Sequence, residues 1–465
     1  MPVILWTDAL ILLLVAGAVG FGLYAARHEH LRVPWRRVVG SRLGVVALVV
    51  LSFYVVVGLL DTLHFHPRLD GRDRDREAKY SSEVLSLLDV ALTPLREHQE
   101  KTFSAPFAAY GFVKEAIEQP DGSVIRAYPR LDWGGRHLAD PTVGRAADIG
   151  STALVGGILG LLCWLLLSAG ILVLLARSRR ESWRRTLTAV ARGTTPVPWR
   201  SALATLAIML VLGGIAGLLS LDYHILGTDK VGEDVFYQGL KSIRTGLVIG
   251  TLTTLVMLPA AILLGIMAGY FKGLADDVIQ YLYTTLNSIP SVLLIAATIL
   301  MLQVYMNNHA DEFASLVERA DLRLLFLCII LGVTSWTSLC RLLRGESLKL
   351  READYVLAAA ALGVGHFTII LRHILPNVLH IVLIAVVLDF SGLVLAEAVL
   401  SYINIGVDPT MNSWGNMINS ARLELARDPV VWWSLTAAFV FMFTLVLAAN
   451  LFADVVRDAF DPRLR

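Results

Sequence analysis

Several features that are common in soluble and secreted proteins are scarce in this chain of 465 residues. Only 17% of the residues are charged, and 40 basic side chains nearly balance 39 acidic ones. Such a composition argues against a soluble enzyme or a disordered scaffold, and the balanced charge offers no attraction to nucleic acid. The three cysteines, Cys163, Cys328 and Cys340, all lie in apolar runs. We therefore expect neither a disulfide framework nor a metal site.

Catalytic signatures are also missing from the sequence. It contains no Gly-x-x-x-x-Gly-Lys-Ser/Thr phosphate loop, no His-Glu-x-x-His zinc motif and no Gly-x-Ser-x-Gly nucleophile turn. We expect no catalytic residue and no cofactor in this chain, so that any ATP and magnesium would be bound by another polypeptide.

Apolar sequence, in contrast, is abundant: 56% of the residues are hydrophobic and the mean hydropathy is +0.64. A bilayer core about 30 Å thick requires roughly 20 apolar residues in a helix. The sequence predicts an all-α polytopic membrane protein with nine such helices. They lie at about 5–26, 43–62, 150–176, 201–221, 245–270, 285–305, 323–341, 378–399 and 430–453.

The distribution of arginine and lysine predicts the orientation of these helices. The segments after the first and third runs hold clusters of arginine and few acids, and such basic loops stay in the cytoplasm. We expect the N-terminus outside and the C-terminus in the cytoplasm. No basic segment precedes the first run, which contains Asp8, so we interpret it as a retained anchor rather than a cleaved signal peptide.

Four parts follow one another along the chain in this interpretation. Residues 1–62 hold two N-terminal transmembrane helices, and 63–149 form an extracytoplasmic lobe. Residues 150–199 hold a third extra helix and a basic cytoplasmic linker, and 200–465 form a six-helix domain with a cytoplasmic loop at 343–377. The 63–149 segment contains a charged run at 70–76, but also enough leucine and aromatic residues for a small folded lobe.

The cytoplasmic loop contains an alanine-rich stretch after a charged one. Gly363 stands where the end of a helix favours a left-handed residue, and Pro376 marks the return to the membrane. Small side chains permit close backbone approach, so this short helix is suited to a partner's groove. By composition alone, a solvated loop with an incidental alanine run remains an alternative.

The stretch resembles the "EAA" loop of ABC importer permeases, because Ala358, Ala359, Gly363, Leu375 and Pro376 keep its register. Four further segments resemble the C-type permease of the dipeptide/oligopeptide/nickel importer family. They are 226–235, 268–276, 397–415 and 457–465. The ordered matches extend from about residue 200 to the C-terminus and leave 1–199 uncovered.

This resemblance implies a type I permease core in a bacterial cytoplasmic (inner) membrane, forming half of a translocation path for di- or oligopeptides. The implied partners are a second, B-type permease, two cytoplasmic ABC ATPases that bind ATP and Mg, and an extracytoplasmic solute-binding protein. Alternatives are a stand-alone ion-coupled secondary transporter, the same importer type with a nickel complex or sugar as substrate, and a signalling or assembly protein. Residues 63–149 are expected to contact the binding protein or the partner permease.

The resemblance also assigns candidate roles to residues. ATPase coupling falls to Asp354, Tyr355, Ala358, Ala359, Ala360, Ala361, Leu362, Gly363 and Pro376. The outer-mouth motif comprises Gly227, Thr228, Asp229, Gly232, Asp234, Trp414 and Gly415. Two departures matter: Leu357 replaces the loop's acidic residue, and Glu233 replaces an arginine near the outer mouth.

Three residues in or near the apolar runs are candidates for the path or its gate. Ionisable groups inside a membrane are costly and point to function, so we expect Asp389 to line the path or bridge helices rather than face lipid. Glu397 is either functional or interfacial. Pro290 is expected to kink the sixth helix, because proline removes a helical hydrogen bond.

Overall fold

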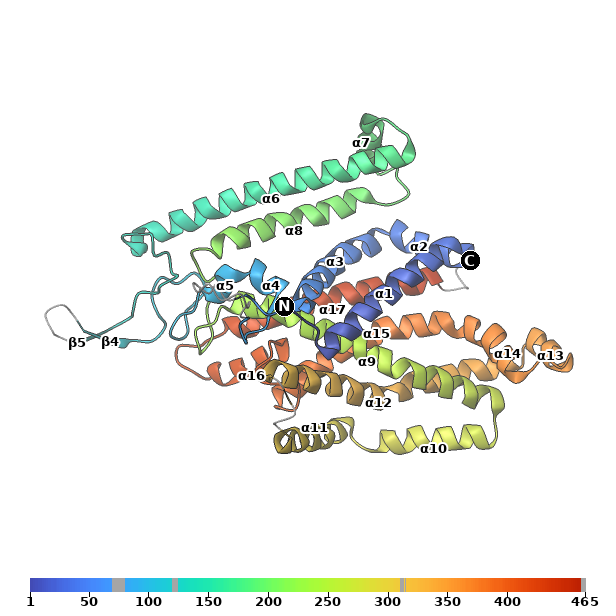
Figure 1. Ribbon diagram of the computed structural model, residues 1–465. Helices are drawn as coiled ribbons and strands as arrows, with labels where there is room; N and C mark the ends of the chain where they lie inside the picture. The colour runs from blue at the N-terminus through green and yellow to red at the C-terminus, as the bar shows by residue number, and fades with distance from the viewer. Residues whose placement is uncertain (69–79, 119–123, 310–312, 314, 461–465) are drawn as a thin grey trace. The chain divides into compact units, whose positions relative to one another are not determined.

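The computed structural model describes residues 1–68, 80–118, 124–309, 313 and 315–460 (Figure 1). The described chain is mostly helical. Nine of its helices are long and apolar enough to cross a membrane, and each overlaps one of the nine predicted runs. The charged run at 70–76 and the final residues of the 457–465 segment lie outside the described residues.

The chain divides into two compact units that do not follow its linear order. One unit combines residue 1 with 36–244 and 412–448, and the other combines 2–35, 245–411 and 449–465. Two long helices, α9 (Val235–Phe271) and α17 (Trp433–Phe460), contribute residues to both units. The four-part division along the sequence stays a prediction.

The first unit contains three complete membrane-crossing helices and a set of short elements. Its elements are α3 (Arg42–Thr62), β2 (His64–Phe65), β3 (Leu85–Ser86), α4 (Leu87–Ala91), α5 (Thr93–Glu97), β4 (Glu115–Glu118), β5 (Val124–Ala127), α6 (Pro141–Arg179), α7 (Trp183–Arg192), α8 (Trp199–Leu219) and α16 (Trp414–Glu424). Strands β2 and β3 pair antiparallel, as do β4 and β5, where Glu115 lies opposite Ala127.

Helices α6 and α8 of this unit run side by side (Figure 1). Glycines allow their backbones to touch: a Cβ atom on Gly160 would lie 2.3 Å from the carbonyl oxygen of Leu210. Close approach at small residues is the usual way in which helices pack in lipid. Helix α6 begins nine residues before the predicted run, because Asp140 caps it by accepting a hydrogen bond from the Thr142 amide and Pro141 suits its first turn.

The second unit contains the remaining elements and the later residues of α9 and α17. Its elements are β1 (Pro2–Val3), α1 (Trp6–Arg27), most of α2 (Glu29–Gly40), α10 (Leu274–Ser288), α11 (Ser291–Asn308), α12 (Leu316–Arg351), α13 (Asp354–Ala361), α14 (His366–Ile369), η2 (Ile370–Ile374, a π-helical turn) and α15 (Leu375–Tyr402).

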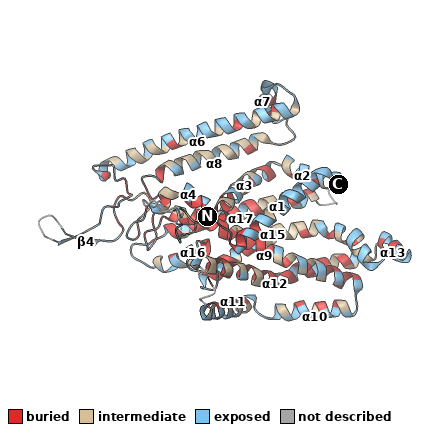
Figure 2. Cartoon of the chain, viewed as in Figure 1, coloured by how far each residue is buried: buried red, intermediate tan, exposed pale blue. Residues whose placement is uncertain are grey.

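The core of the second unit lies where α9, α12 and α15 pack together. Met257 and Ala261 of α9, Cys340 of α12 and Val378 of α15 are buried in one apolar cluster. Figure 2 shows buried residues along both α9 and α12. Gly265 brings these two helices close, since a Cβ atom there would lie 2.8 Å from the Cys340 carbonyl oxygen.

The prediction that Pro290 kinks a single spanning helix is wrong. Helix α10 ends at Ser288 and α11 begins at Ser291, so Pro290 lies between two separate helices, at the N-cap of the second. The physical reason is that Pro290 has no N–H to continue the hydrogen bonding of α10, while its fixed φ suits the start of α11. The apolar run at 285–305 is therefore divided between two helices, with a non-helical turn at residues 289–290.

Candidate functional site

The segment between α8 and α9, residues 220–234, carries five of the seven predicted outer-mouth residues. We call it the outer segment. Thr228 is completely buried in it. Its hydroxyl donates to the Thr102 carbonyl at 2.9 Å and accepts from the Ser104 amide at 2.7 Å. The Trp433 indole donates to the Thr228 carbonyl at 2.8 Å. The hydrogen-bonding capacity of Thr228 is thus used within the protein.

Gly232 lies directly against the backbone at Glu100. A Cβ atom on Gly232 would lie 1.7 Å from the Glu100 carbonyl oxygen, and Gly232 has φ +82°. The Glu100 amide donates to the Gly232 carbonyl at 3.0 Å. Only glycine permits this contact without displacing the backbone. Glycine at this motif position therefore allows the chain at Glu100 to pack against the outer segment.

Asp229 and Glu233 form a local network at the surface of the outer segment. The Asp229 carboxylate accepts from the backbone amides of Val231 and Glu233, each at 2.9 Å. The Gln238 side chain donates to Asp229 at 3.0 Å and to Glu233 at 2.9 Å. Glu233, which replaces the family's arginine, is therefore held by local polar contacts.

His224 is buried between two carboxylates. Its Nδ1 lies 2.7 Å from Asp234, and its Nε2 lies 3.7 Å from Glu100. Burial alone would lower the pKa of His224, but the two carboxylates outweigh it and raise this pKa to about 9. Burial likewise opposes the ionisation of Glu100, yet His224 and the Trp133 amide hold its pKa below the usual value. The three side chains form a buried ionic cluster.

A second buried cluster joins α3, α4 and the first turns of α9. The Lys241 ammonium lies 2.6 Å from Asp61 and 2.8 Å from Asp89. The hydroxyl of Ser86 donates to Asp61 at 2.6 Å, and that of Tyr237 donates to Asp89 at 2.7 Å. Burial would raise the pKa of Asp89, but Lys241, the Tyr237 hydroxyl and the Ser86 amide bring it below its usual value.

Sequence reasoning missed this Lys241 cluster. The available signal was that both Asp61 and Lys241 stand at the ends of apolar runs, where a charge needs a partner. Nothing in the sequence indicated that the partners would be each other.

The remaining two outer-mouth residues, Trp414 and Gly415, begin α16. Trp414 is 1% exposed, and its indole donates to the Gly239 carbonyl of α9 at 3.1 Å. Gly415 is also buried. All seven predicted residues thus belong to the first unit, where the polar contacts described above join them to other parts of the same chain.

The predicted coupling stretch has the opposite character. It forms α13, and Gly363 just beyond has φ +79°, as the sequence predicted for the helix end. Of the stretch, Val356 and Ala359 are buried. The exposed residues are Asp354, Tyr355, Leu357, Ala358, Ala360, Ala361, Leu362 and Gly363, and Pro376 is exposed in the first turn of α15. Leu362 is 83% exposed, so the stretch presents a free surface in this chain.

Polar contacts brace α13 against the surrounding helix ends. The Asn377 side chain of α15 donates to the Tyr355 hydroxyl at 3.2 Å. Next to α13, the His366 Nδ1 lies 2.8 Å from the Tyr270 hydroxyl at the end of α9. The loop is therefore attached to α9 and α15.

A bidentate ion pair adds α10 to this assembly. The Arg344 guanidinium of α12 donates to the two oxygens of Asp276 at 2.5 and 2.7 Å. Its hydrogen bonds hold the pKa of Asp276 below the usual value. Because α12 leads into α13, Arg344 connects this loop with α10.

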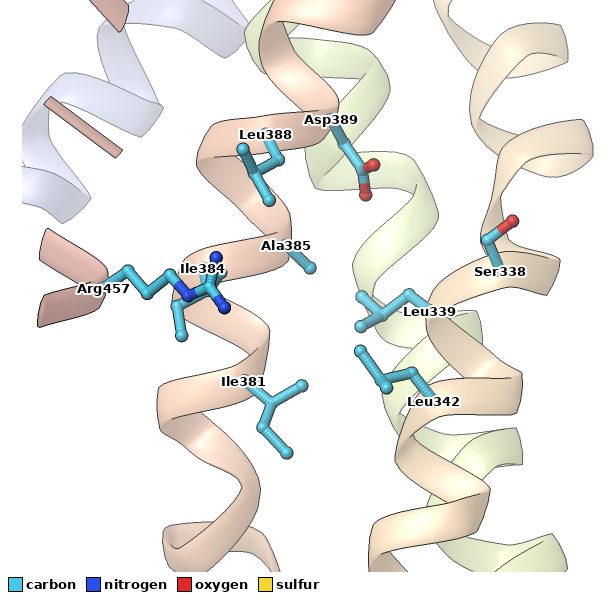
Figure 3. A pocket seen from close by; sticks show the side chains of 9 residues that line it. All are labelled: Ser338, Leu339, Leu342, Ile381, Ile384, Ala385, Leu388, Asp389 and Arg457. Atoms are coloured by element: carbon cyan, nitrogen blue, oxygen red, sulfur yellow. The ribbon is translucent and has the colours of Figure 1, made fainter. Parts of the chain in front are cut away.

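A cavity of about 420 Å³ lies within the second unit (Figure 3). Asp389 of α15 is half-buried at its wall, and its carboxylate forms no hydrogen bond or ion pair with any residue that the structure describes. The lining residues are Ser338, Leu339, Leu342, Ile381, Ile384, Ala385, Leu388, Asp389 and Arg457.

The two other candidate path residues lie elsewhere. Glu397 is 2% exposed and accepts a hydrogen bond from the Ser401 hydroxyl at 2.7 Å, and neither it nor Pro290 lines this cavity. Within the described ranges, no three His, Cys, Asp or Glu side chains are grouped so that they could hold a metal ion.

Comparison with known proteins identifies the family. Residues 261–465 match the binding-protein-dependent transport system inner membrane component family. The glutathione transport system permease protein GsiD of Pectobacterium atrosepticum is 31% identical over 52% of this chain and 73% of its own length. The chain belongs to this family of ABC importer permeases.

Two further relatives agree with this assignment. The dipeptide transport system permease protein DppC of Lactococcus lactis is 30% identical over 53% of this chain and 66% of its own length. The oligopeptide transport system permease protein OppC of Mycobacterium bovis is 31% identical, over 52% and 77%. The permease is thus a multi-pass inner-membrane protein, and family membership does not favour the secondary-transporter alternative.

Proposed function

We propose that this permease forms half of the translocation path for di- or oligopeptides in a binding-protein-dependent ABC importer. Helix α13 couples the path to cytoplasmic ATPases, which close and open around ATP and Mg. The permease then alternates between inward- and outward-facing packings, and only contacts that differ between the two states can drive that shift. Its partners are a second, B-type permease, two ATPases and an extracytoplasmic solute-binding protein.

One observation carries the coupling proposal. Helix α13 exposes most of its small side chains, while Tyr355, His366 and Arg344 connect the surrounding loop to α15, α9 and α10. An ATPase that displaces the exposed surface of α13 would thereby also move the helices to which the loop is bonded. The names of the relatives, which are permease proteins of dipeptide, oligopeptide and glutathione transport systems, support a peptide-like substrate.

Co-purification tests this function directly. The permease, tagged at its C-terminus and expressed from its native locus, would be purified in mild detergent and its companions identified by mass spectrometry. We expect two ATPase copies, one further permease and a binding protein. A folded homo-oligomer without any ATPase would contradict the proposal and favour a stand-alone transporter.

A substitution pair locates the coupling contact. Ala358→Trp places a bulky ring on the exposed side of α13, and we expect it to abolish ATPase co-purification. Lys349→Ala is the matched control, because the Lys349 side chain is 74% exposed and lies outside α13. Full ATPase recovery with Ala358→Trp would place the contact elsewhere.

The orientation is proposed as N-terminus outside and C-terminus in the cytoplasm, from the arginine-rich segments. Lys101→Cys and Ala361→Cys, each in a Cys163→Ser background, test it with a membrane-impermeant maleimide on spheroplasts. Both sites are exposed. We expect rapid labelling of the first and labelling of the second only after lysis, and the reverse pattern would invert the topology.

The lobe of residues 63–149 is proposed to contact the solute-binding protein. Its β4–β5 hairpin carries exposed apolar side chains, with Val124 65% and Tyr128 50% exposed. A photo-cross-linking residue at Val124 is expected to capture the binding protein. One at Glu83, whose side chain is 62% exposed in a different stretch of the lobe, serves as the control. Capture of the partner permease alone would reassign this surface.

A further inference from the structure

The cavity of the second unit carries one acidic and one basic group in otherwise apolar surroundings. Six of its nine lining side chains are leucine, isoleucine or alanine. Asp389 enters from α15 and Arg457 from α17 (Figure 3). An ionised carboxylate inside a membrane is costly unless a cation or a proton neutralises it, and Asp389 has no such partner among the described residues. The cavity therefore lacks a positive group at Asp389.

Arg457 does not supply that group. It forms no ion pair with Asp389 among the described residues, and in Figure 3 its guanidinium lies beside Ile384, away from the Asp389 carboxylate. The cavity thus presents separated negative and positive groups rather than a closed pair.

A cavity with separated charges of opposite sign complements a ligand that carries a cationic and an anionic end. A short peptide with free termini is such a ligand. The volume, about 420 Å³, is within the usual range for small-molecule sites. The apolar faces of Leu339, Leu342 and Ile381 would then contact the ligand's side chains.

We propose that this cavity is a subsite for a short zwitterionic peptide, whose ammonium binds Asp389 and whose carboxylate binds Arg457. The subsite rests on the proposed importer function, since it places substrate recognition inside the permease as well as on the binding protein. Asp389 is the residue that distinguishes a free amino terminus from a blocked one. A lipid acyl chain is the competing occupant of such a cavity, and the tests below separate the two.

Transport by the complete importer gives the first test. The native complex, with its co-purified partners, is reconstituted into liposomes with saturating binding protein, and uptake of L-alanyl-L-alanine is compared with that of its N-acetyl form. In Asp389→Asn, we expect free-dipeptide uptake to fall about tenfold and its advantage over the acetylated form to disappear. An unchanged preference in this variant would overturn the subsite.

Matched variants exclude a general defect. Asp454→Asn removes an exposed carboxylate from the same end of α17 as Arg457 without touching the cavity, so we expect unchanged uptake. Arg457→Gln should remove the preference for a free over an amidated carboxyl terminus. Asp389→Glu should keep the preference for a free amino terminus, which a loss caused only by misfolding would not.

A chemical test does not depend on the importer proposal. Dicyclohexylcarbodiimide modifies carboxyl groups in apolar sites, and mass spectrometry of the peptide that contains Asp389 measures its modification in the purified chain. We expect millimolar L-alanyl-L-alanine to slow the modification at least fivefold and the N-acetyl form to leave it unchanged. Equal rates with both peptides would indicate a lipid-filled groove and overturn the subsite.

The two kinds of failure are distinguishable. If the peptide protects Asp389 but no ATPase co-purifies, the subsite stands and the importer function falls. If the ATPases co-purify while Asp389 is unprotected and Asp389→Asn retains its preference, the importer function stands and the subsite falls.

Discussion

The outer segment and residues 343–377, which we call the coupling loop, both carry family motif residues. These residues are mostly buried in the first and mostly exposed in the second. In the outer segment, Thr228, Gly232 and Asp234 are buried or covered by residues 100–104 and by His224. In the coupling loop, Ala358, Ala361 and Leu362 are exposed. A motif residue whose polar atoms are already bonded inside the chain has little left to offer a partner.

This difference separates structural from partner-facing roles. In the outer segment, the motif residues hold residues 100–104 of the lobe, so a partner protein would contact lobe residues instead. In α13, the motif residues are exposed, and under the proposed function they contact the ATPase directly. The following substitutions test the two halves of this comparison, beginning with the largest expected effect.

Lys241→Met should have the largest effect, because it leaves Asp61 and Asp89 buried without their cation. Removing one partner of a buried ion pair costs about 3–5 kcal/mol. Equilibrium unfolding in mixed detergent micelles measures the loss. Lys101→Met is the control and should change little, because the Lys101 side chain is 82% exposed. A loss for Lys241→Met no larger than the control's would show that the lobe is not held by this cluster.

The pH dependence of stability tests the His224 cluster. The pKa of His224 is raised to about 9, so its stabilisation is fully present below about pH 6.5 and is lost as pH rises through 9. The expected loss is on the order of 3 kcal/mol, from about 1.4 kcal/mol per unit. The pKa of Glu100 is lowered, so its contribution is lost only in acid, below about pH 4.5.

Melting temperatures between pH 4 and pH 10 measure this profile. His224→Gln should remove the alkaline fall and leave a lower, flatter curve. A variant with the same alkaline fall as the parent would assign the transition to another group.

Asp276→Asn tests whether the coupling loop is rigidly attached. The variant removes the charge from a bidentate pair with Arg344, and hydrogen bonds to charged groups contribute about 1.5–3 kcal/mol. We expect ATPase co-purification to persist while the stimulation of ATP hydrolysis by binding protein falls. The exchange of both residues, Asp276→Arg with Arg344→Asp, should restore part of it. Full stimulation in the single variant would make the pair dispensable for coupling.

Leu357→Glu should have the smallest effect on stability, within about 0.5 kcal/mol, because the side chain is an exposed surface position. Leu357 is 49% exposed. The variant restores the acidic residue that the family carries there, so ATPase retention on the column should become salt-dependent. Identical salt profiles for variant and parent would show that this position does not contact the ATPase.

The features that could be predicted from the sequence are those set by local composition. Nine apolar runs predicted nine spanning helices, since a run of that length in lipid can satisfy its backbone only as a helix. The left-handed conformation of Gly363 could also be predicted, because the residue after a helix end often takes a positive φ, which glycine adopts readily. Sequence reasoning also selected Asp389, as a carboxylate within an apolar run.

Long-range contacts could not be predicted. Helix α9 begins at Val235, ten residues before its apolar run, and these first residues include Lys241, which bonds to the distant Asp61 and Asp89. A hydropathy profile assigns these polar residues to a loop, because it contains no information on their buried partners. The lobe's contacts with the outer segment join residues more than 120 positions apart, and no periodicity announces them.

The Lys241 cluster also has a consequence for biosynthesis. Ribosomes complete Asp61 and Asp89 long before Lys241, so the nascent chain must hold two carboxylates at the membrane surface until α9 is inserted. A truncated chain that begins at α8 would instead leave the ammonium of Lys241 and the side chains of Thr228 and Trp433 without their covering residues. We expect such a truncated product to be recognised by membrane quality-control proteases. We therefore expect the N-terminal region to be required for a stable permease rather than to be a removable extension.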